Sequence, residues 1–142
     1  SGASPTRAGN PQLRLSCPNV AGTALDERQR PKVTGRLLFV FDSPEHPLRH
    51  VSYRRRHKDH ASAAADLDET VRLLTEHYGP PTVAAEVPTT FRVFHPYKWE
   101  WRFATVRVEA SALNYGERGV DVLEAIEVPW PVRADAAARP ER

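Results

Sequence analysis

An apolar stripe with helical spacing dominates the middle of the chain. Between Asp59 and Gly79, apolar side chains recur at intervals of three and four residues, which places them on one side of an α-helix. Asp59 or Ser62 can cap the start, and Gly79 followed by two prolines ends the helix. The pattern therefore predicts one helix that buries a single side. The stripe consists of Ala64, Leu67, Val71, Leu74 and Tyr78.

The acidic residues of this segment fall off the stripe. Asp66, Asp68 and Glu69 crowd its first half, where the helix dipole favours negative charge. A solvated helix face explains these residues, and nothing in their pattern indicates the desolvation that separates the pKa values of a catalytic acid and base. We expect them to face water.

Strand patterns surround the helix. Residues 33 to 42 contain an unbroken apolar run from Leu37 to Phe41, which predicts an inner strand of a sheet. A proline-containing turn at 43 to 47 precedes alternation over Leu48 to His57, which predicts the antiparallel partner. After the helix, strands are expected at 91 to 94 and 99 to 113, flanking a loop at 95 to 98. A further hairpin loop at 114 to 119 leads into an alternating strand from residue 120 to 128.

The apolar side chains of the segment 99 to 113 change faces partway along. Trp99, Trp101 and Phe103 share one parity, whereas Val106, Val108 and Ala110 take the other. Because side chains alternate along a strand, the two sets lie on one side only if a bulge or bend intervenes near residues 104 and 105. The alternative is that the first three aromatic residues face away from the helix as an exposed stripe. We predict the bulge or bend, and the exposed stripe, which would be the functional interpretation, stays open as the alternative.

These elements predict an α+β domain. The expected architecture is one antiparallel sheet of about five strands, in the order β-β-α-β-β-β, with the amphipathic helix on one face. A further strand at 12 to 16 is an option. The expected single domain spans residues 12–131, with a compact core at 33–131. Residues 1–11, which begin with a Ser-Gly typical of a cleavage scar, and residues 132–142 are expected to be disordered tails.

Composition excludes several classes of protein. No window approaches the roughly 18 apolar residues of a membrane-spanning helix, and a single cysteine excludes a disulfide framework or a cysteine-based zinc site. The net charge is +2, but it is unevenly distributed. Residues 49 to 60 hold five basic side chains against one acid. Such a patch attracts phosphates or acidic proteins, although a short charge run is often only a solvated strand end.

Signals for metal or catalytic chemistry are thin. His46 with His50 and His57 with His60 form pairs, but neither pair has helical ligand spacing and basic residues lie beside both. The glycine-rich and nucleophile-elbow motifs are absent from the sequence. Cys17 is interpreted as an ordinary thiol, because Pro18 follows it and no rigid element supports it. We therefore predict no catalytic residue, no cofactor and no metal.

Two segments combine aromatic and cationic side chains, which together suit an interface. We expect a non-catalytic binding or protein-interaction domain, monomeric and without a membrane span, whose partner is another protein. A nucleic-acid-binding domain that uses the basic strand end is the alternative, and a small hydrolase is the third class. The competing interpretation is that the aromatic residues complete the core. The candidate binding residues are Tyr53, Arg54, Arg55, Arg56, Lys58, Tyr97, Lys98, Trp99 and Trp101.

The end of the predicted helix resembles a pattern found in small exported bacterial domains of unassigned role. In those domains a helix ends in Tyr-Gly-x-Pro and a tryptophan-bearing strand follows, as residues 78 to 81 and 99 to 101 do here. The resemblance covers about two-thirds of the chain and supplies no site residues. It implies an exported, periplasmic or cell-envelope location, with any signal peptide upstream of Ser1.

Overall fold

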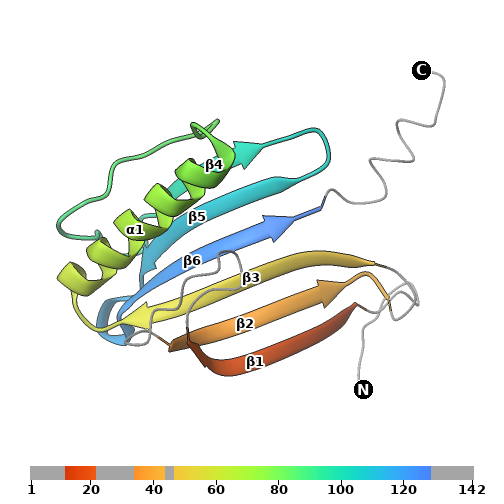
Figure 1. Ribbon diagram of the computed structural model, residues 1–142. Coiled ribbons are helices and arrows are strands. Elements are labelled where there is room, and N and C mark those ends of the chain that lie inside the picture. The colour runs from red at the N-terminus through yellow and green to blue at the C-terminus, as the bar shows by residue number, and fades with distance from the viewer. Residues whose placement is uncertain (1–11, 22–33, 44–46, 129–142) are drawn as a thin grey trace.

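A computed structural model describes residues 12–21, 34–43 and 47–128. Within these ranges, six strands form one antiparallel sheet in the order β1-β2-β3-β6-β5-β4, and the helix α1 packs against one face (Figure 1). The predicted α+β class is confirmed, with six strands instead of about five. The elements are β1 (Leu13–Ala21), β2 (Thr34–Phe41), β3 (Leu48–His57), α1 (His60–Tyr78), β4 (Tyr97–Arg102), β5 (Arg107–Asn114), the 3-10 turn η2 (Gly116–Arg118) and β6 (Val120–Glu127).

The strands before the helix follow the predictions closely. β2 lies between β1 and β3, as an inner strand should, and β3 pairs with it in antiparallel register. The optional first strand is present and longer than expected, because β1 runs to Ala21. The predicted tails, the residues after 128 and the turn residues 44–46, which include His46, lie outside the described residues.

The strands after the helix differ from the prediction. The segment 91 to 94 is not a strand; it contributes one isolated bridge, in which Val93 pairs with Asn114. The segment 99 to 113 is two strands, because the chain reverses in a turn closed by a hydrogen bond from the Phe103 amide to the Val106 carbonyl, 2.9 Å long. The bend therefore lies where the parity of the side chains changes, but it is a complete hairpin turn.

That turn decides where the tryptophans lie. Trp99 pairs with Ala110 and Trp101 pairs with Val108, so all four side chains share the helix side of the sheet. Trp99 is 3% exposed and Trp101 is 1% exposed. The alternative of an exposed aromatic stripe is wrong for Trp99 and Trp101, because the parity change marks a reversal of the chain and both strands turn the same face to the helix; Phe103, in the turn, is 48% exposed.

The helix is bounded as its sequence predicts. The Asp59 carboxylate accepts a hydrogen bond from the Ser62 amide at 2.7 Å, and Gly79, with φ of 89°, donates its N–H to the Thr75 carbonyl. Leu67 and Leu74 are buried in the main core. Val71 is partly buried against the same core. Asp66 departs from the prediction, since it is only 8% exposed and faces the sheet.

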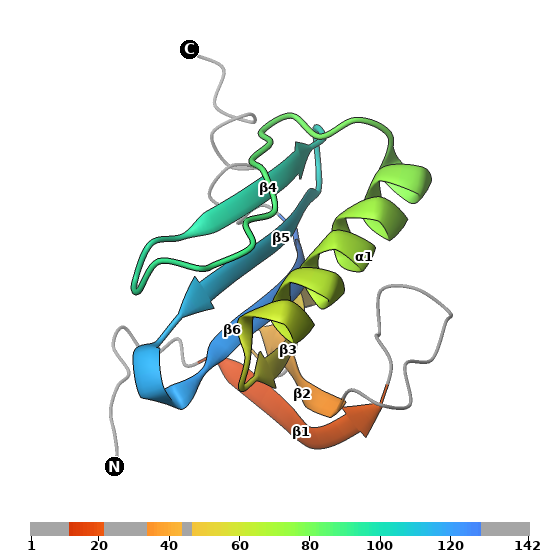
Figure 2. The same cartoon turned by 90° about the vertical axis from the view of Figure 1, so that its left-hand side faces the viewer.

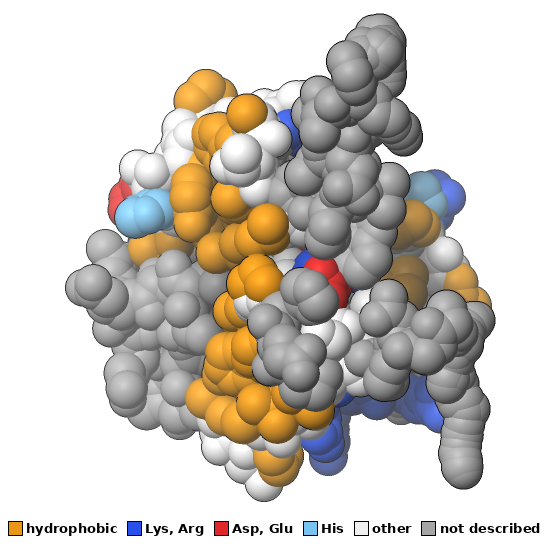
Figure 3. Space-filling view, turned by 90° about the vertical axis from the view of Figure 1, so that its right-hand side faces the viewer, with side chains coloured by type: hydrophobic (Ala, Val, Ile, Leu, Met, Phe, Trp, Pro, Cys, Tyr) orange, Lys and Arg blue, Asp and Glu red, His pale blue; other side chains and the backbone are white. Residues whose placement is uncertain are grey.

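The helix covers only part of one sheet face. α1 contacts β3, β5 and β6, whereas β1 and β2 extend beyond it (Figure 2). The register places Leu13 and Leu15 on the same side as α1, beyond its cover, and both are exposed. Figure 3 shows hydrophobic side chains gathered in a band along one side of the molecule. We call the sheet face opposite α1 the open face. The register places most charged strand residues there: Arg36, Arg54, Arg56, Lys98, Glu100, Arg102, Arg107 and Asp121.

Candidate anion-binding site

The arginine run of β3 is divided between the two faces of the sheet. Arg54 and Arg56 are exposed on the open face, whereas Arg55, with no exposed surface, points to the helix side. The division follows from the two-residue period of a strand. The three consecutive arginines therefore lie in two different environments. Arg55 was predicted as a binding residue, but it is buried and is not part of an exposed site.

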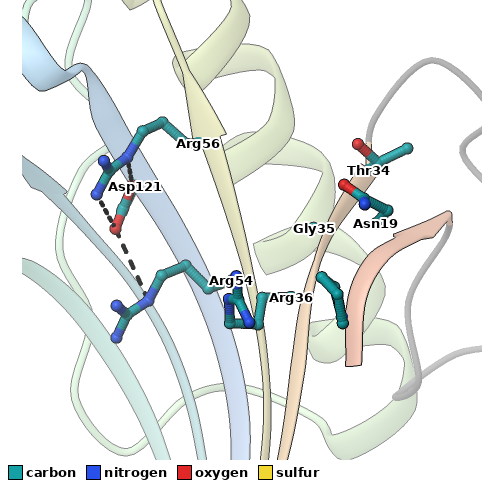
Figure 4. Close-up of a pocket in the computed structure, with 8 residues that line it drawn as sticks. Asn19, Thr34, Gly35, Arg36, Arg54, Arg56 and Asp121 are labelled. Carbon is teal, nitrogen blue, oxygen red and sulfur yellow. Dashed lines mark hydrogen bonds and ion pairs between the residues drawn. The ribbon is translucent and has the colours of Figure 1, made fainter. Parts of the chain in front are cut away.

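Arg54 and Arg56 line an open pocket of about 350 Å³ on the open face. Arg36 of β2 lies directly across from Arg54 in the register, and Asp121 of β6 lies across from Arg56. Figure 4 shows Arg54 and Arg56 reaching toward Asp121, with Asn19 and Thr34 at the other side of the pocket. We call these residues the arginine pocket: Pro18, Asn19, Thr34, Gly35, Arg36, Arg54, Arg56 and Asp121.

An irregularity in β1 forms one wall of the arginine pocket. The pairing of β1 with β2 shifts between Cys17 and Val20, so Pro18 and Asn19 drop out of the ladder. Pro18 has no N–H to donate, and Asn19 adopts a φ of 60°, a left-handed conformation that asparagine tolerates better than most residues. The two residues of this bulge line the pocket together with Arg36.

Gly35 lies in the β2–β3 pairing that forms the floor of the arginine pocket, and this pairing requires glycine at that position. A Cβ at this position would lie 2.3 Å from the Arg54 carbonyl oxygen and 2.8 Å from the Cγ of Arg55. Backbone cannot yield at such a distance, so any side chain here would force β2 and β3 apart. Gly35 thus allows the close strand pairing that holds Arg36 beside Arg54.

The arginine pocket has an excess of positive charge. Asp121 accepts two hydrogen bonds from Arg56, at 2.6 and 3.0 Å, and lies 3.7 Å from Arg54. Arg36 donates to the neutral Ser16 hydroxyl at 2.8 Å. The hydrogen bond to Asp121 raises the pKa of Arg56, so this guanidinium stays charged. One carboxylate therefore faces three cations, an arrangement suited to binding an anion.

Arg55 belongs to a buried network between the helix and the sheet. It donates to both carboxylate oxygens of Asp66, at 2.7 and 2.9 Å, and to Glu124 at 2.7 Å and Thr70 at 2.9 Å. His57 contacts Asp66 at 2.7 Å. Burial alone would raise the pKa of Asp66, but hydrogen bonds from His57 and Arg55 and the charge of Arg55 lower it well below its usual range. Asp66 is therefore ionised at neutral pH and ties α1 to β3.

The other predicted site residues do not join the arginine pocket. Tyr53 is fully buried on the helix side of the sheet, and its hydroxyl donates to the Val20 carbonyl of β1. Tyr97 is half-buried on the helix side against Phe91. Lys98 lies on the open face but at the far edge of the sheet, where it contacts Glu100 at 2.8 Å. Lys58 is exposed and lies outside the pocket lining.

Sequence reasoning missed Arg36, Asn19 and Asp121 as pocket residues. These residues come from three strands, and only the pairing register brings them beside Arg54. A usable signal was present in β1, where Pro18-Asn19 interrupts an otherwise strand-like segment and indicates a bulge.

Comparison with protein-family models, with curated proteins and with solved structures finds no match to this chain. Among the described residues, no group of three or more His, Cys, Asp or Glu side chains is placed to hold a metal ion. In the same ranges, α1 and every other helix lack the length and apolarity needed to cross a membrane.

Proposed function

We propose that this chain is a binding domain whose arginine pocket recognises an acidic segment of another protein. The observation that supports the proposal is the convergence of Arg36, Arg54 and Arg56 on one open pocket with a single carboxylate, Asp121. A guanidinium presents parallel N–H donors that match the two oxygens of a carboxylate. The pocket is preformed by strand backbone, which reduces the entropy lost on binding.

The distribution of charge on the open face favours a compact acidic segment over a nucleic acid. Beyond β6, the basic side chains are already paired, because Arg107 contacts Glu127 and both Lys98 and Arg102 contact Glu100. A nucleic-acid backbone needs a basic surface that continues along several phosphates. The excess charge here lies on the neighbouring strands β1, β2 and β3, where Arg14 is also exposed, and the pocket within it suits one or two carboxylates.

A binding titration tests the proposal. A short fluorescein-labelled peptide rich in glutamate is titrated with the full chain, and fluorescence anisotropy is measured at low and at moderate salt. We expect saturable binding that weakens about tenfold or more when Arg36 and Arg54 are both replaced by alanine, because charge-assisted hydrogen bonds are lost. Labelled single-stranded DNA is titrated in parallel.

Arg72→Ala is the matched control. Arg72 is an exposed arginine of α1 that pairs with Glu69 and Glu76, far from the pocket lining, so its loss should leave peptide affinity unchanged. Equal weakening by Arg72→Ala and by the pocket variant would contradict the proposal, as would the absence of peptide binding. Tighter DNA binding with a steep salt dependence would replace the proposed partner with a nucleic acid.

A further inference from the structure

An aromatic pair adjoins the arginine pocket. The guanidinium of Arg56 lies over the ring of Tyr115, 5.4 Å from its centroid. The Tyr115 ring in turn meets the ring of Phe94 edge to face, with 6.0 Å between centroids. Arg56 thus belongs to the pocket and to this aromatic pair at once. A ligand group held by Arg56 lies within reach of Phe94.

Phe94 is unusual in both its exposure and its backbone conformation. Its side chain is 66% exposed and the neighbouring Val93 is 55% exposed. The backbone of Phe94 has a φ of 58°, which is costly for a bulky residue and is maintained by a hydrogen bond from its amide to the Asn114 carbonyl. Backbone strain of this kind clusters at binding sites. Among the described residues, the other non-glycine residue with a positive φ is Asn19, in the pocket wall.

We infer that Phe94 and Tyr115 form an apolar subsite, so that the acidic segment also presents a large apolar side chain. This inference rests on the proposed function and specifies its ligand. The two ring contacts set the spacing between the subsites, and an extended peptide advances about 3.3 Å per residue. The recognised segment therefore carries its apolar side chain two or three residues from an acidic one.

The chemistry of the subsite favours a peptide side chain over a nucleotide base. Phe94 and Tyr115 meet at 84°, so the pair does not offer two parallel faces between which a base could insert. The positive pocket alongside supplies charge complementarity with the acid of the same segment.

Two peptides that differ at one position test the inference. The first is the glutamate-rich peptide, and the second has a phenylalanine in place of a serine three residues after a glutamate. With the unmodified chain, the phenylalanine peptide is expected to bind about tenfold more tightly. Phe94→Ala is expected to abolish that gain while leaving affinity for the first peptide unchanged. Phe103→Ala, which removes an exposed aromatic side chain from the β4–β5 turn, should preserve the gain.

The outcomes separate the two proposals. If the first peptide binds but phenylalanine adds nothing, or if Phe94→Ala keeps the gain, the apolar subsite is overturned and the arginine pocket stands. If neither peptide binds, the proposed function itself fails. An equal loss of the gain in Phe94→Ala and Phe103→Ala would show a general effect of surface aromatic residues and would also overturn the subsite.

Discussion

Arginines on the two faces of β3 lie in different environments. Arg55, on the helix side, is completely buried and bonded to two carboxylates and a hydroxyl. Arg54 and Arg56, on the open face, share one carboxylate at the rim of an open pocket. The three guanidinium groups differ in burial and in the carboxylates that contact them. Two carboxylates contact the buried Arg55, whereas the exposed Arg54 and Arg56 share Asp121.

We propose that this difference gives the helix side a structural role and the open face a binding role. On the helix side, a charge is removed from water, so the loss of a charged partner of Arg55 should be strongly destabilising. On the open face, water solvates the unpaired part of the charge, and a partner can displace it. The following predictions test this division, from the largest expected effect to the smallest.

Arg55→Ala should have the largest effect on stability. The substitution leaves Asp66 and Glu124 buried without their common cation, which costs about 3–5 kcal/mol. Urea denaturation followed by circular dichroism measures the loss. Arg54→Ala in the adjacent position is the control, since an exposed ion pair contributes about 0–1 kcal/mol. Equal losses in the two variants would contradict the division of β3 into two faces.

The decrease in the free energy of unfolding at acid pH should depend on Asp66. Its pKa is lowered in the folded chain, so the unfolded chain binds the proton first as the pH falls. The stabilising contribution is therefore present at neutral pH and decreases as the pH drops below about 4. Urea midpoints measured between neutral pH and pH 3 should decline less steeply in Asp66→Asn than in the unmodified chain.

Asp68→Asn provides the control for that pH dependence. Asp68 is exposed on the same helix, so its replacement should leave the acid decline unchanged. If Asp66→Asn and the unmodified chain lose stability in parallel, the buried network does not couple to acid unfolding.

Gly35→Ala should have an intermediate effect. The added Cβ would meet the Arg54 carbonyl oxygen, and crowding of this kind costs about 1–3 kcal/mol. Because Gly35 also lies in the pocket floor, peptide affinity should fall with stability. Thermal melts and peptide titrations on the same sample check both. A variant that melts normally and binds normally would show that the close pairing of β2 and β3 is not required.

Arg54→Ala should have the smallest effect on stability and a clear effect on binding. The lost ion pair with Asp121 is exposed and 3.7 Å long, so the melting temperature should change little. Affinity for a glutamate-rich peptide should fall several-fold, because one of three guanidinium donors is gone. A large drop in melting temperature with unchanged affinity would reverse the roles of the two faces.

Periodicity predicted the elements better than their positions in the sheet. The helix from His60 to Tyr78 and the strand from Leu48 to His57 follow from patterns within each segment. The hairpin after Trp101 did not, because a change of parity fits either a reversal or a change of face. Only the pairing of Trp101 with Val108 resolves that ambiguity.

The candidate site was partly predictable. Arg54 and Arg56 stood out as part of a basic run, but which members of the run reach solvent depends on the face that the helix covers. Asp66 was placed on a solvated face because its partners, Arg55 and Glu124, are distant in sequence. Buried charge pairs between separate elements leave no periodic signal in one sequence.

The central claim is that the open-face arginines bind an acidic partner while Arg55 does not. The most direct test is a two-dimensional NMR titration of the arginine Nε–H groups with the glutamate-rich peptide. The account predicts that Arg36, Arg54 and Arg56 signals shift saturably, whereas the Arg55 signal, protected by its bond to Asp66, stays in place. Shifts confined to other arginines, or a shift of Arg55 as large as that of Arg54, would contradict it.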